Sequence, residues 1–536
     1  MLGRMQHQAL TVDRFLTHAA RWHGATPVCE RHRGKSRVTT YSEIYDRARQ
    51  LSAALIATGI AAGDRVATIA MNHIRHLEAW YGIMGIGAVC HTVNPRLFKD
   101  QLRYILEHAG SRIILADDSF ASLAYELAAD CPNVERVMIF ADGPVASGVS
   151  RADDYDAWIG AHPVPLEPWS NVEEEAAAGL CYTSGTTGHP KGVLYSHRSH
   201  YLHTLMTLQH DALNLSAADV VLPVVPMFHA NAWGIAFSGP AVGARLVLPG
   251  AQLDGPSLHA AILEEEVTFA AGVPTVWQGL LQHVADTGEG LGCLKSVLVG
   301  GSACPPGMIR VFEDRHGIEV IHAWGMTETS PVASLAVPTH AVQAMSAHAR
   351  HSQACKQGRP MFGIDVALET DEGSLLDHDG KTAGHLMVRG ATVVRRYYGE
   401  ESDAINAEGW FDTGDVATID EHGYIQITDR AKDLIKSGGE WISSLDIENV
   451  VMGASDVACA AVVATPHERW GERPLLLVQP KAGHTVDPDN LRALLTQHIP
   501  SWWMPDEIRT VAMIPLGPTG KIDKKRIRAQ LVDGSQ

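Results

Sequence analysis

The sequence predicts an α/β fold with a large N-terminal domain and a small α+β C-terminal domain. Short apolar runs alternate with helical patterns along most of the chain, as in "RVATIA" (65–70) followed by "HIRHLEAWYGIMGIGAV" (73–89). This alternation is typical of α/β folds. From about residue 361 it gives way to β-rich pieces separated by Gly and Asp turns. At 536 residues the chain is too long for one core, so we expect at least two domains.

At the N-terminus, apolar residues recur at helical spacing, which predicts an amphipathic helix on a folded body. They are Phe15, Leu16, Ala19, Ala20 and Trp22. Because Asp13 and Arg14 interrupt this stretch, we expect neither a secretory signal nor a membrane span there.

The net charge and the cysteine pattern of the chain exclude several classes of protein. A formal net charge of −18 argues against a general nucleic-acid binder, which needs a positive face. It still allows one anionic ligand in a local basic pocket. Eight cysteines without a CxxC pair do not resemble a disulfide framework or a zinc site. We therefore expect a cytoplasmic protein with reduced thiols, no nucleic-acid partner and no integral membrane contact.

The second half of the chain predicts two further units. "GIDVALETDEGSLL" (363–376), "GHLMVRG" (384–390) and "GYIQITD" (423–429) predict a small antiparallel barrel or meander. After residue 443, helical and strand patterns alternate over about 100 residues, enough for a compact domain. We expect a large domain at 1–429, a hinge at 430–433 and a mobile C-terminal domain at 434–536.

Residues 182–193, "YTSGTTGHPKGV", combine glycines and hydroxyl side chains with one lysine. Glycine exposes backbone N–H groups, hydroxyls add donors and lysine adds a positive charge, so the stretch predicts a phosphate-binding loop. It is not a Walker loop, because Pro190 stands where that pattern needs glycine and Gly192 follows Lys191. Composition alone also allows a flexible linker. The apolar "AAGLCY" before it and "GVLYSH" after it favour a strand–loop–strand instead.

This stretch resembles the phosphate loop of the adenylate-forming enzymes, which include acyl-CoA synthetases, aryl-CoA ligases, firefly luciferase and peptide-synthetase adenylation domains. Five further motifs follow in that family's order, so the resemblance covers essentially the whole chain. They are "VGGSACP" (299–305), "HAWGMTE" (322–328), "GWFDTGD" (409–415), "DRAKDLIKSGGEWIS" (429–443) and "PTGKIDK" (518–524).

The resemblance implies ATP, Mg²⁺ and coenzyme A as cofactors and assigns the nucleotide site. The β- and γ-phosphates are expected to contact Thr183, Ser184, Gly185, Thr186, Thr187 and Lys191. Around the adenine it places Gly301, Ser302 and Ala303 on one wall and His322, Ala323 and Trp324 on another. Thr327 supplies a hydroxyl, and Glu328 is the one expected Mg²⁺ ligand, Ser184 not being a ligand. A lone glutamate is otherwise a solvated charge.

Asp415 and Arg430 are expected at the ribose and the α-phosphate. A carboxylate can accept hydrogen bonds from both ribose hydroxyls, and a planar guanidinium suits the phosphate. Aspartate at such a position is also a common turn cap. Both readings remain open for Asp415 at this point.

Lys521 taken alone is an ordinary surface lysine. The resemblance instead implies that it bridges the substrate carboxylate and the α-phosphate, offsetting the repulsion between two anions. It also implies that the backbone turns at Lys432 and then presents Gly438, Gly439 and Glu440 as a tunnel for the pantetheine arm. The nearby Lys524, Lys525, Arg526 and Arg528 are expected on a solvated helix face.

The acid itself is poorly defined by the sequence. "PMFHANAWG" (226–234) carries His229 and Trp233, and such residues are often core packing. With "GGEWISS" it resembles the medium- and long-chain fatty acyl-CoA synthetases, a branch that includes 3-(methylthio)propionate-CoA ligases. That implies His229 beside the substrate carboxylate, Trp233 in the acyl wall and Trp441 at the acyl entrance. A pocket discriminates single methylenes weakly, so chain length does not follow.

The predicted function is therefore ATP-dependent activation of a small-molecule carboxylic acid to acyl-AMP and transfer to coenzyme A. Two alternatives stay open: an adenylating enzyme that does not use free coenzyme A, and a catalytically inactive binding protein of the same fold. Fatty acyl members of the family can form homodimers through the N-terminal domain, so a homodimer is a further expectation.

Overall fold

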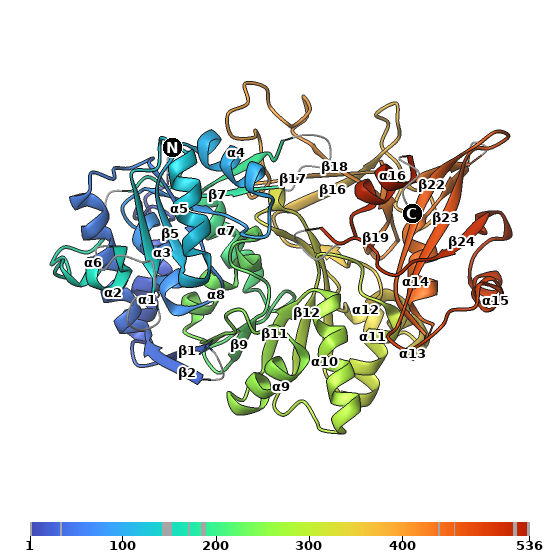
Figure 1. Ribbon diagram of the computed structural model, residues 1–536, viewed down its shortest axis with the longest axis horizontal. Helices are drawn as coiled ribbons and strands as arrows, with labels where there is room; N and C mark the ends of the chain where they lie inside the picture. The colour runs from blue at the N-terminus through green and yellow to red at the C-terminus, as the bar shows by residue number, and fades with distance from the viewer. Residues whose placement is uncertain are drawn as a thin grey trace.

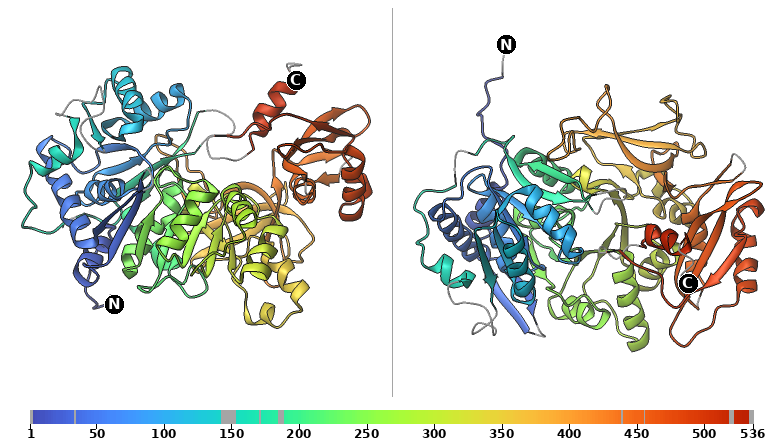
Figure 2. Two further views of the ribbon diagram at one scale, coloured as in Figure 1. Left: turned by 60° about the horizontal axis from the view of Figure 1, so that its bottom comes forward. Right: turned by 45° about the horizontal axis from the view of Figure 1, so that its top comes forward.

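The computed structural model describes residues 3–32, 35–141, 153–169, 172–183, 189–437, 440–454, 456–517 and 522–532. Within those residues the strands form four sheets. Figures 1 and 2 show the N-terminal part (blue) and the middle of the chain (green) side by side, with the C-terminal sheet (red) at the other end of the molecule.

The six-stranded sheet has the order β6-β5-β3-β4-β7-β8 and is parallel except for the β7–β8 pair. Its strands are β3 (Arg65–Ile69), β4 (Val89–Thr92), β5 (Ser111–Asp117), β6 (Arg136–Phe140), β7 (Ala177–Tyr182) and β8 (Gly192–Ser196). The predicted strand–loop–strand is confirmed, because Tyr182 pairs with Gly192 across the antiparallel β7–β8 ladder. The phosphate-loop motif is therefore the connection of a hairpin.

The nine-stranded sheet has the order β15-β14-β13-β12-β11-β9-β10-β1-β2. Its strands are β1 (Pro27–His32), β2 (Lys35–Thr40), β9 (Val220–Pro223), β10 (Arg245–Leu248), β11 (Phe269–Gly272), β12 (Ser296–Val299), β13 (Glu319–Gly325), β14 (Val332–Leu335) and β15 (Arg359–Pro360). Strands β9, β11, β12 and β13 run parallel. Their carboxyl ends therefore open at the same edge of the sheet.

The other two sheets come from the second half of the chain. The four-stranded sheet is an antiparallel meander of β16 (Ile364–Glu369), β17 (Gly384–Gly390), β18 (Phe411–Ile419) and β19 (Ile425–Arg430), which confirms the meander expectation. The C-terminal sheet contains β20 (Ile435–Ser437), β21 (Glu440–Ile442), β22 (Val457–His467), β23 (Gly471–Pro480) and β24 (Glu507–Thr510).

Helices cover the faces of these sheets (Figure 1). The N-terminal ones are α1 (Asp13–Trp22), α2 (Tyr41–Ala57), α3 (Ile74–Met84), α4 (Lys99–Ala109), α5 (Ala121–Asp130), α6 (Tyr155–Gly160), α7 (His197–Thr207) and α8 (Ile235–Val242). The middle ones are α9 (Gly255–Glu264), α10 (Pro274–Thr287), α11 (Pro306–Arg310), α12 (His340–Gln343) and α13 (Ala347–Ala354). The C-terminal domain holds α14 (Ser444–Met452), α15 (Pro488–His498) and α16 (Lys524–Val532). In the described part of the chain, no helix combines the length and apolar character needed to cross a membrane.

The amphipathic N-terminal helix is confirmed as α1. Phe15 is buried and its ring stacks on Tyr201 of α7, with 4.9 Å between the ring centroids. The sequence pattern placed Trp22 on the same buried apolar face. This prediction is wrong, because Trp22, at the end of α1, is 65% exposed. The helix ends there, so the last apolar residue of the pattern extends past the surface that α1 covers.

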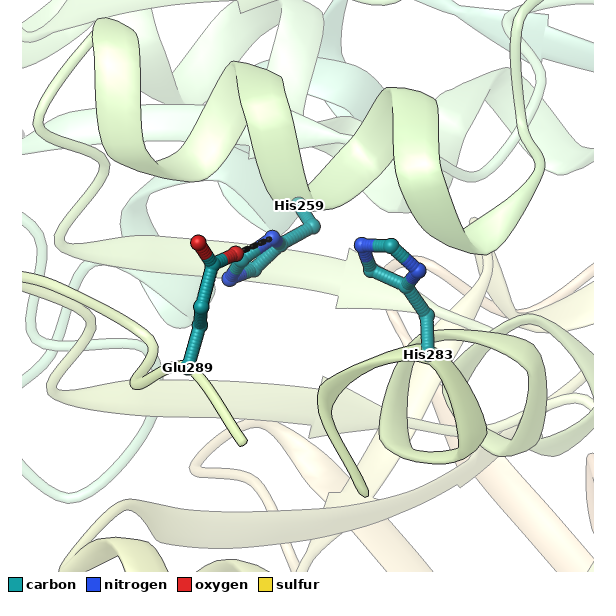
Figure 3. Close-up of side chains that lie close together, drawn as sticks. All are labelled: His259, His283 and Glu289. Atoms are coloured by element: carbon teal, nitrogen blue, oxygen red, sulfur yellow. Dashed lines mark ion pairs between the residues drawn. The ribbon is translucent and has the colours of Figure 1, made fainter. Parts of the chain in front are cut away.

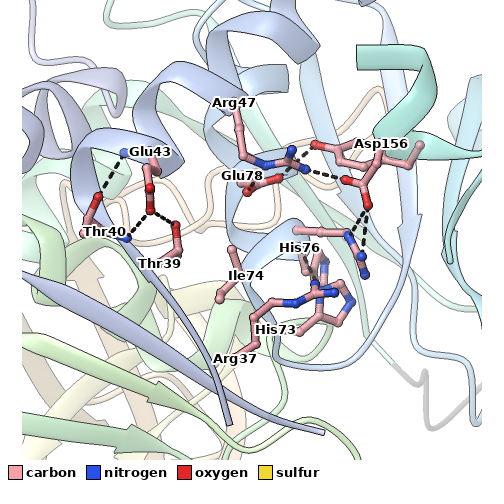
Figure 4. Close-up of polar contacts among 12 residues, drawn as sticks. Arg37, Thr39, Thr40, Glu43, Arg47, His73, Ile74, His76, Glu78 and Asp156 are labelled. Atoms are coloured by element: carbon pink, nitrogen blue, oxygen red, sulfur yellow. Dashed lines mark hydrogen bonds and ion pairs between the residues drawn. The ribbon is translucent and has the colours of Figure 1, made fainter. Parts of the chain in front are cut away.

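A buried charge joins three helices of the N-terminal region (Figure 4). Glu78 of α3 has a side chain only 1% exposed, and its Oε1 accepts a hydrogen bond of 2.6 Å from Arg47 Nε of α2. The same guanidinium pairs with Asp156 of α6. A buried carboxylate is costly unless it is paired and hydrogen-bonded, so this contact fixes α2 against α3.

Replacing Arg47 with methionine should destabilise the protein by roughly 3 kcal/mol, because it keeps the aliphatic stem but leaves Glu78 buried without its cation. Denaturant unfolding of the N-terminal region measures the change. Lys99→Met is the matched control, since Lys99 pairs with Glu126 at 2.9 Å but both side chains are about half exposed. Equal stability of the two variants would contradict the role given to Glu78.

Candidate active site

A cavity of about 2100 Å³ lies where the two large sheets, the meander and the C-terminal domain meet. Most of the site residues predicted from sequence that the structure describes line this one cavity. They are Thr183, Lys191, His229, Trp233, Gly301, Ser302, Ala303, Ala323, Trp324, Thr327, Glu328, Asp415, Arg430 and Lys432. Residues more than 200 positions apart in the sequence are thus brought to one place by the fold.

Several predicted residues lie outside the described part of the chain. These are Ser184, Gly185, Thr186, Thr187, Gly438, Gly439 and Lys521. Glu440 and Trp441 belong to β21, where they pair with Ser437 and Lys436 of β20.

Residues at both ends of the phosphate-loop motif are held by the β7–β8 ladder and by helix α4. Thr183 N–H donates a hydrogen bond of 2.9 Å to the carbonyl of Lys191, closing the hairpin ladder. On one side, the Tyr182 hydroxyl lies 2.7 Å from Nδ1 of His108 on α4. On the other, His189 stacks on Tyr104 of the same helix, with 4.4 Å between ring centroids. Helix α4 therefore holds both flanks of the motif.

Lys191 and Glu328 are linked by a residue that the sequence reading missed. The ammonium of Lys191 lies 4.7 Å from the ring centroid of Tyr397, a cation–π contact. The hydroxyl of Tyr397 donates a hydrogen bond of 2.8 Å to Oε1 of Glu328. Tyr397 lies in the connection between β17 and β18 and belongs to none of the six motifs, so only its place in the fold reveals it.

Glu328 is a buried carboxylate and not the solvated charge that a lone glutamate often is. Its residue is 6% exposed, and burial raises the pKa of its carboxyl group. The hydrogen bond from Tyr397 and the positive charges of Arg430 and Lys191 act in the opposite direction. The carboxylate is therefore stabilised by the cations around it, and a further cation bound in the cavity would favour its charged form.

A tight turn holds Thr327 and Glu328 in place. It is the short 3₁₀ helix Thr327–Thr329, which follows β13. The Tyr195 hydroxyl donates to the carbonyl of Thr327 at 2.7 Å. Position 325, just before the turn, requires glycine, because a Cβ there would lie 2.0 Å from the carbonyl oxygen of Pro331. The glycine of "GMTE" thus lets the chain cross itself closely.

Asp415 faces Arg430 across the meander. The two residues are paired on β18 and β19, and Arg430 Nε lies 2.7 Å from Asp415 Oδ1. Trp324 Nε1 donates to the other oxygen, Oδ2, at 2.9 Å. The carboxylate is thus held in a fixed orientation by donors on both of its oxygens. Asp415 is therefore bound by side chains from two sheets and is more than a turn cap.

His322 is placed differently from its expected neighbours on the adenine wall. It is fully buried, its Nε2 accepts from the backbone N–H of Cys304 at 3.2 Å, and its Nδ1 lies 3.1 Å from the carbonyl oxygen of Cys355. Burial lowers the pKa of His322 to about 4. The neutral ring with its hydrogen on Nδ1 satisfies both contacts, so His322 supports the loop of Ser302 and Ala303 from behind.

The acyl-side motif adopts an unusual backbone. Ala230, Asn231, Ala232 and Trp233 all have left-handed φ values between 43° and 55°. Such a conformation costs energy for each non-glycine residue, and it is often found at functional sites. It places Trp233 against the loop that follows β12, because a Cβ on Gly300 of that loop would lie 3.2 Å from Cη2 of Trp233.

The comparisons with known proteins agree with this site. Residues 15–398 match the description of an AMP-binding enzyme, and residues 446–521 match the AMP-binding enzyme C-terminal domain. The chain belongs to the AMP-binding enzyme family.

Two relatives match this AMP-binding enzyme along nearly its whole length. The 3-methylmercaptopropionyl-CoA ligase of Ruegeria pomeroyi is 43% identical and the match covers 99% of both chains. The medium-chain-fatty-acid–CoA ligase of Ectopseudomonas oleovorans is 44% identical, over 99% of this chain and 98% of the relative. Among solved structures, an anthranilate CoA ligase in complex with anthranoyl-AMP has a TM-score of 0.86 at 22% identity, covering 98% of each chain, which supports the fold.

On the C-terminal side of the enzyme's cavity, the prediction for Lys524 is wrong. Lys524 was expected on a solvated helix face, but its side chain is 13% exposed and its Nζ lies 2.8 Å from Oε1 of Glu448 on α14. Arg528 forms an ion pair with Asp433. Glu448 is buried and requires a cation, which Lys524 supplies from the first position of α16. Lys525 and Arg526 are exposed as expected.

Tyr397→Phe should lower the rate of ATP–pyrophosphate exchange by roughly tenfold, because it removes a hydrogen bond to a charged group but keeps the aromatic face toward Lys191. Steady-state exchange at saturating ATP measures it. Tyr125→Phe is the control, since it removes a 3.0 Å bond to Asp153 away from the cavity lining. Unchanged exchange in Tyr397→Phe would show that the bond to Glu328 does not matter for adenylation.

Proposed function

We propose that this AMP-binding enzyme is an ATP- and Mg²⁺-dependent acyl-CoA ligase. The observation that carries the proposal is the convergence of Lys191, Glu328 and the Asp415–Arg430 pair on one cavity. The CoA-ligase names of the 43% and 44% identical relatives support the same reaction. In the first step, a substrate carboxylate oxygen bonds to the α-phosphorus of ATP and pyrophosphate leaves. In the second, the sulfur of coenzyme A bonds to the acyl carbon and AMP leaves.

The charged side chains suit the first step. Lys191 lies at the end of the phosphate loop, where it would offset negative charge on the departing pyrophosphate. Asp415 would offer its carboxylate to the ribose hydroxyls, and Arg430 beside it would bind the α-phosphate. These positions hold the nucleotide and orient the phosphorus toward the incoming acid.

The residues present also fit Mg²⁺. Glu328 offers a buried carboxylate inside the cavity, and burial raises its pKa, so a bound cation would restore its charged form. When bound, Mg²⁺ would neutralise phosphate charge. Glu328 is the protein ligand that we assign to it, and Tyr397 orients that carboxylate.

We further propose that the chain divides into a large domain at 1–429, a hinge at 430–433 and a mobile C-terminal domain at 434–536. Strand β19 of the meander ends at Arg430 and β20 of the C-terminal sheet begins at Ile435. Only a few residues around Lys432 therefore connect the two sheets, which suits a rotation about a small number of backbone torsions. In one orientation Lys521 would serve adenylation, and in the other Gly438, Gly439 and Glu440 would receive the pantetheine arm.

For the acid, we propose 3-(methylthio)propionate or a medium- to long-chain fatty acid. The names of the two relatives support this choice, and Trp233 with His229 provides an apolar wall and a polar group in the cavity. We place the enzyme in the cytoplasm, as a homodimer; its eight cysteines, without a CxxC pair, lack the pattern of a disulfide-rich secreted protein.

A panel of short, medium, long, thioether and aryl acids tests the acid class. We expect AMP and acyl-CoA to form in equal amounts with thioether or medium-chain acids and far more slowly with aryl acids. Chromatographic measurement of both products decides between the candidates. Acyl-AMP without acyl-CoA would favour an enzyme that does not use free coenzyme A. Background exchange with every acid would favour an inactive binding protein.

Lys521→Ala tests the proposed division of labour between the two orientations. Adenylation should fall by about a thousandfold, as expected when a charge that stabilises the transition state is lost, while thioester formation from supplied acyl-AMP stays close to wild type. Single-turnover assays of each half-reaction measure the two effects. Lys381→Ala, at an exposed lysine of the meander, is the control. Equal losses in both half-reactions would refute the proposed roles.

A further inference from the structure

A second cluster of chemically active side chains lies outside the cavity lining. His259 of α9, His283 of α10 and Glu289, just after α10, face one another (Figure 3). Their potential ligand atoms all lie within 4.8 Å of one another. Among the described residues, this is the one group of three histidine, cysteine or carboxylate side chains that meets this condition. Neither the family motifs nor the proposed reaction uses it.

The hydrogen bonds of His259 define which ring nitrogen is available. Its Nε2 lies 2.8 Å from the carbonyl oxygen of Gly290, so this nitrogen carries the hydrogen and donates it. The other nitrogen, Nδ1, then has a lone pair when the ring is neutral. A histidine that ligates a metal typically donates its other ring N–H to a carbonyl or carboxylate in this way.

The available nitrogen of His259 faces a carboxylate. Nδ1 lies 3.4 Å from Oε2 of Glu289. A lone pair and a carboxylate oxygen repel unless a cation or a proton lies between them. Two ligands at about 2.0–2.1 Å from a tetrahedral zinc ion are about 3.3 Å apart, so the observed separation suits a shared metal.

His283 completes the group from the neighbouring helix. Its ring lies edge-on to that of His259, with centroids 5.1 Å apart and planes at 65°. The two helices pack closely, because a Cβ on Gly255 of α9 would lie 2.4 Å from the carbonyl oxygen of Gly279 on α10. This close contact fixes the spacing of the two rings, and rigid elements are what a metal site requires.

We propose that His259, His283 and Glu289 form a Zn²⁺ site that is separate from the Mg²⁺ and nucleotide site. Two imidazoles and one carboxylate favour zinc over Mg²⁺ or Ca²⁺, which prefer oxygen ligands. The side chain of Glu289 is 60% exposed, so solvent can supply the fourth ligand. The bound ion joins α9 to the segment after α10, and so links the two helices that precede and follow β11.

Titration of the tag-free, chelator-treated full-length protein tests the proposal. In excess Mg²⁺, isothermal calorimetry with Zn²⁺ should show one ion per chain, and Co²⁺ should give the visible absorption of a tetrahedral site. His283→Gln and Glu289→Gln should each weaken Zn²⁺ binding by about tenfold or more. Zn²⁺ should also raise the melting temperature of the wild type and not that of the variants.

Two controls keep the test independent of folding and of the proposed reaction. His340→Gln changes an exposed histidine on α12 and should leave Zn²⁺ binding unchanged. Glu289→Gln replaces an exposed side chain, so it tests the site even if substitutions of the buried His259 unfold the protein. Absence of Zn²⁺ binding by the wild type, or binding by both variants as tight as that of the wild type, would overturn the proposal and leave a histidine–carboxylate ion pair.

Discussion

The site depends on a constraint of sheet geometry: two of its loops begin where neighbouring strands end, and the ends of parallel strands meet at one edge of the sheet. β12 ends at Val299 and is followed by the glycines of the nucleotide loop, and β13 ends at Gly325 and is followed by the turn that carries Glu328. Because β12 and β13 are parallel neighbours, these loops open at one edge of the nine-stranded sheet. The β7–β8 pair of the other large sheet brings Thr183 and Lys191, which flank the phosphate-loop motif, to the same cavity.

Local charge makes this cavity suitable for anions although the whole chain is acidic. The net charge of −18 belongs to the whole chain, and salt screens interactions between exposed charges beyond about 10 Å. Within the cavity, Lys191 and Arg430 lie near the buried carboxylates of Glu328 and Asp415. Each carboxylate is held by an aromatic donor as well, Tyr397 for Glu328 and Trp324 for Asp415. These two hydrogen bonds fix the direction of the carboxylate oxygens.

Pairing of cations with carboxylates also determines the packing of the C-terminal domain. Lys524 is drawn into the structure by the buried Glu448, and Arg528 by Asp433 next to the proposed hinge. The sequence showed four basic residues in five positions and therefore predicted a solvated face. It could not show that Lys524 faces the buried Glu448, or that Arg528 faces Asp433, because both carboxylates come from segments far earlier in the chain.

The sequence by itself determined the family, the α/β class, the strands on both sides of the phosphate-loop motif, the meander and the charged residues Lys191, Glu328, Asp415 and Arg430 of the cavity. The spacing of glycines, runs of hydroxyl side chains and the hydrophobic period are local properties, so they can be recognised in the sequence alone. Tertiary structure alone decided the link through Tyr397, the supporting place of His322 and the meeting of His259, His283 and Glu289. These depend on which distant segments touch after the core has formed, and contacts of that kind leave no pattern in the order of residues along one chain.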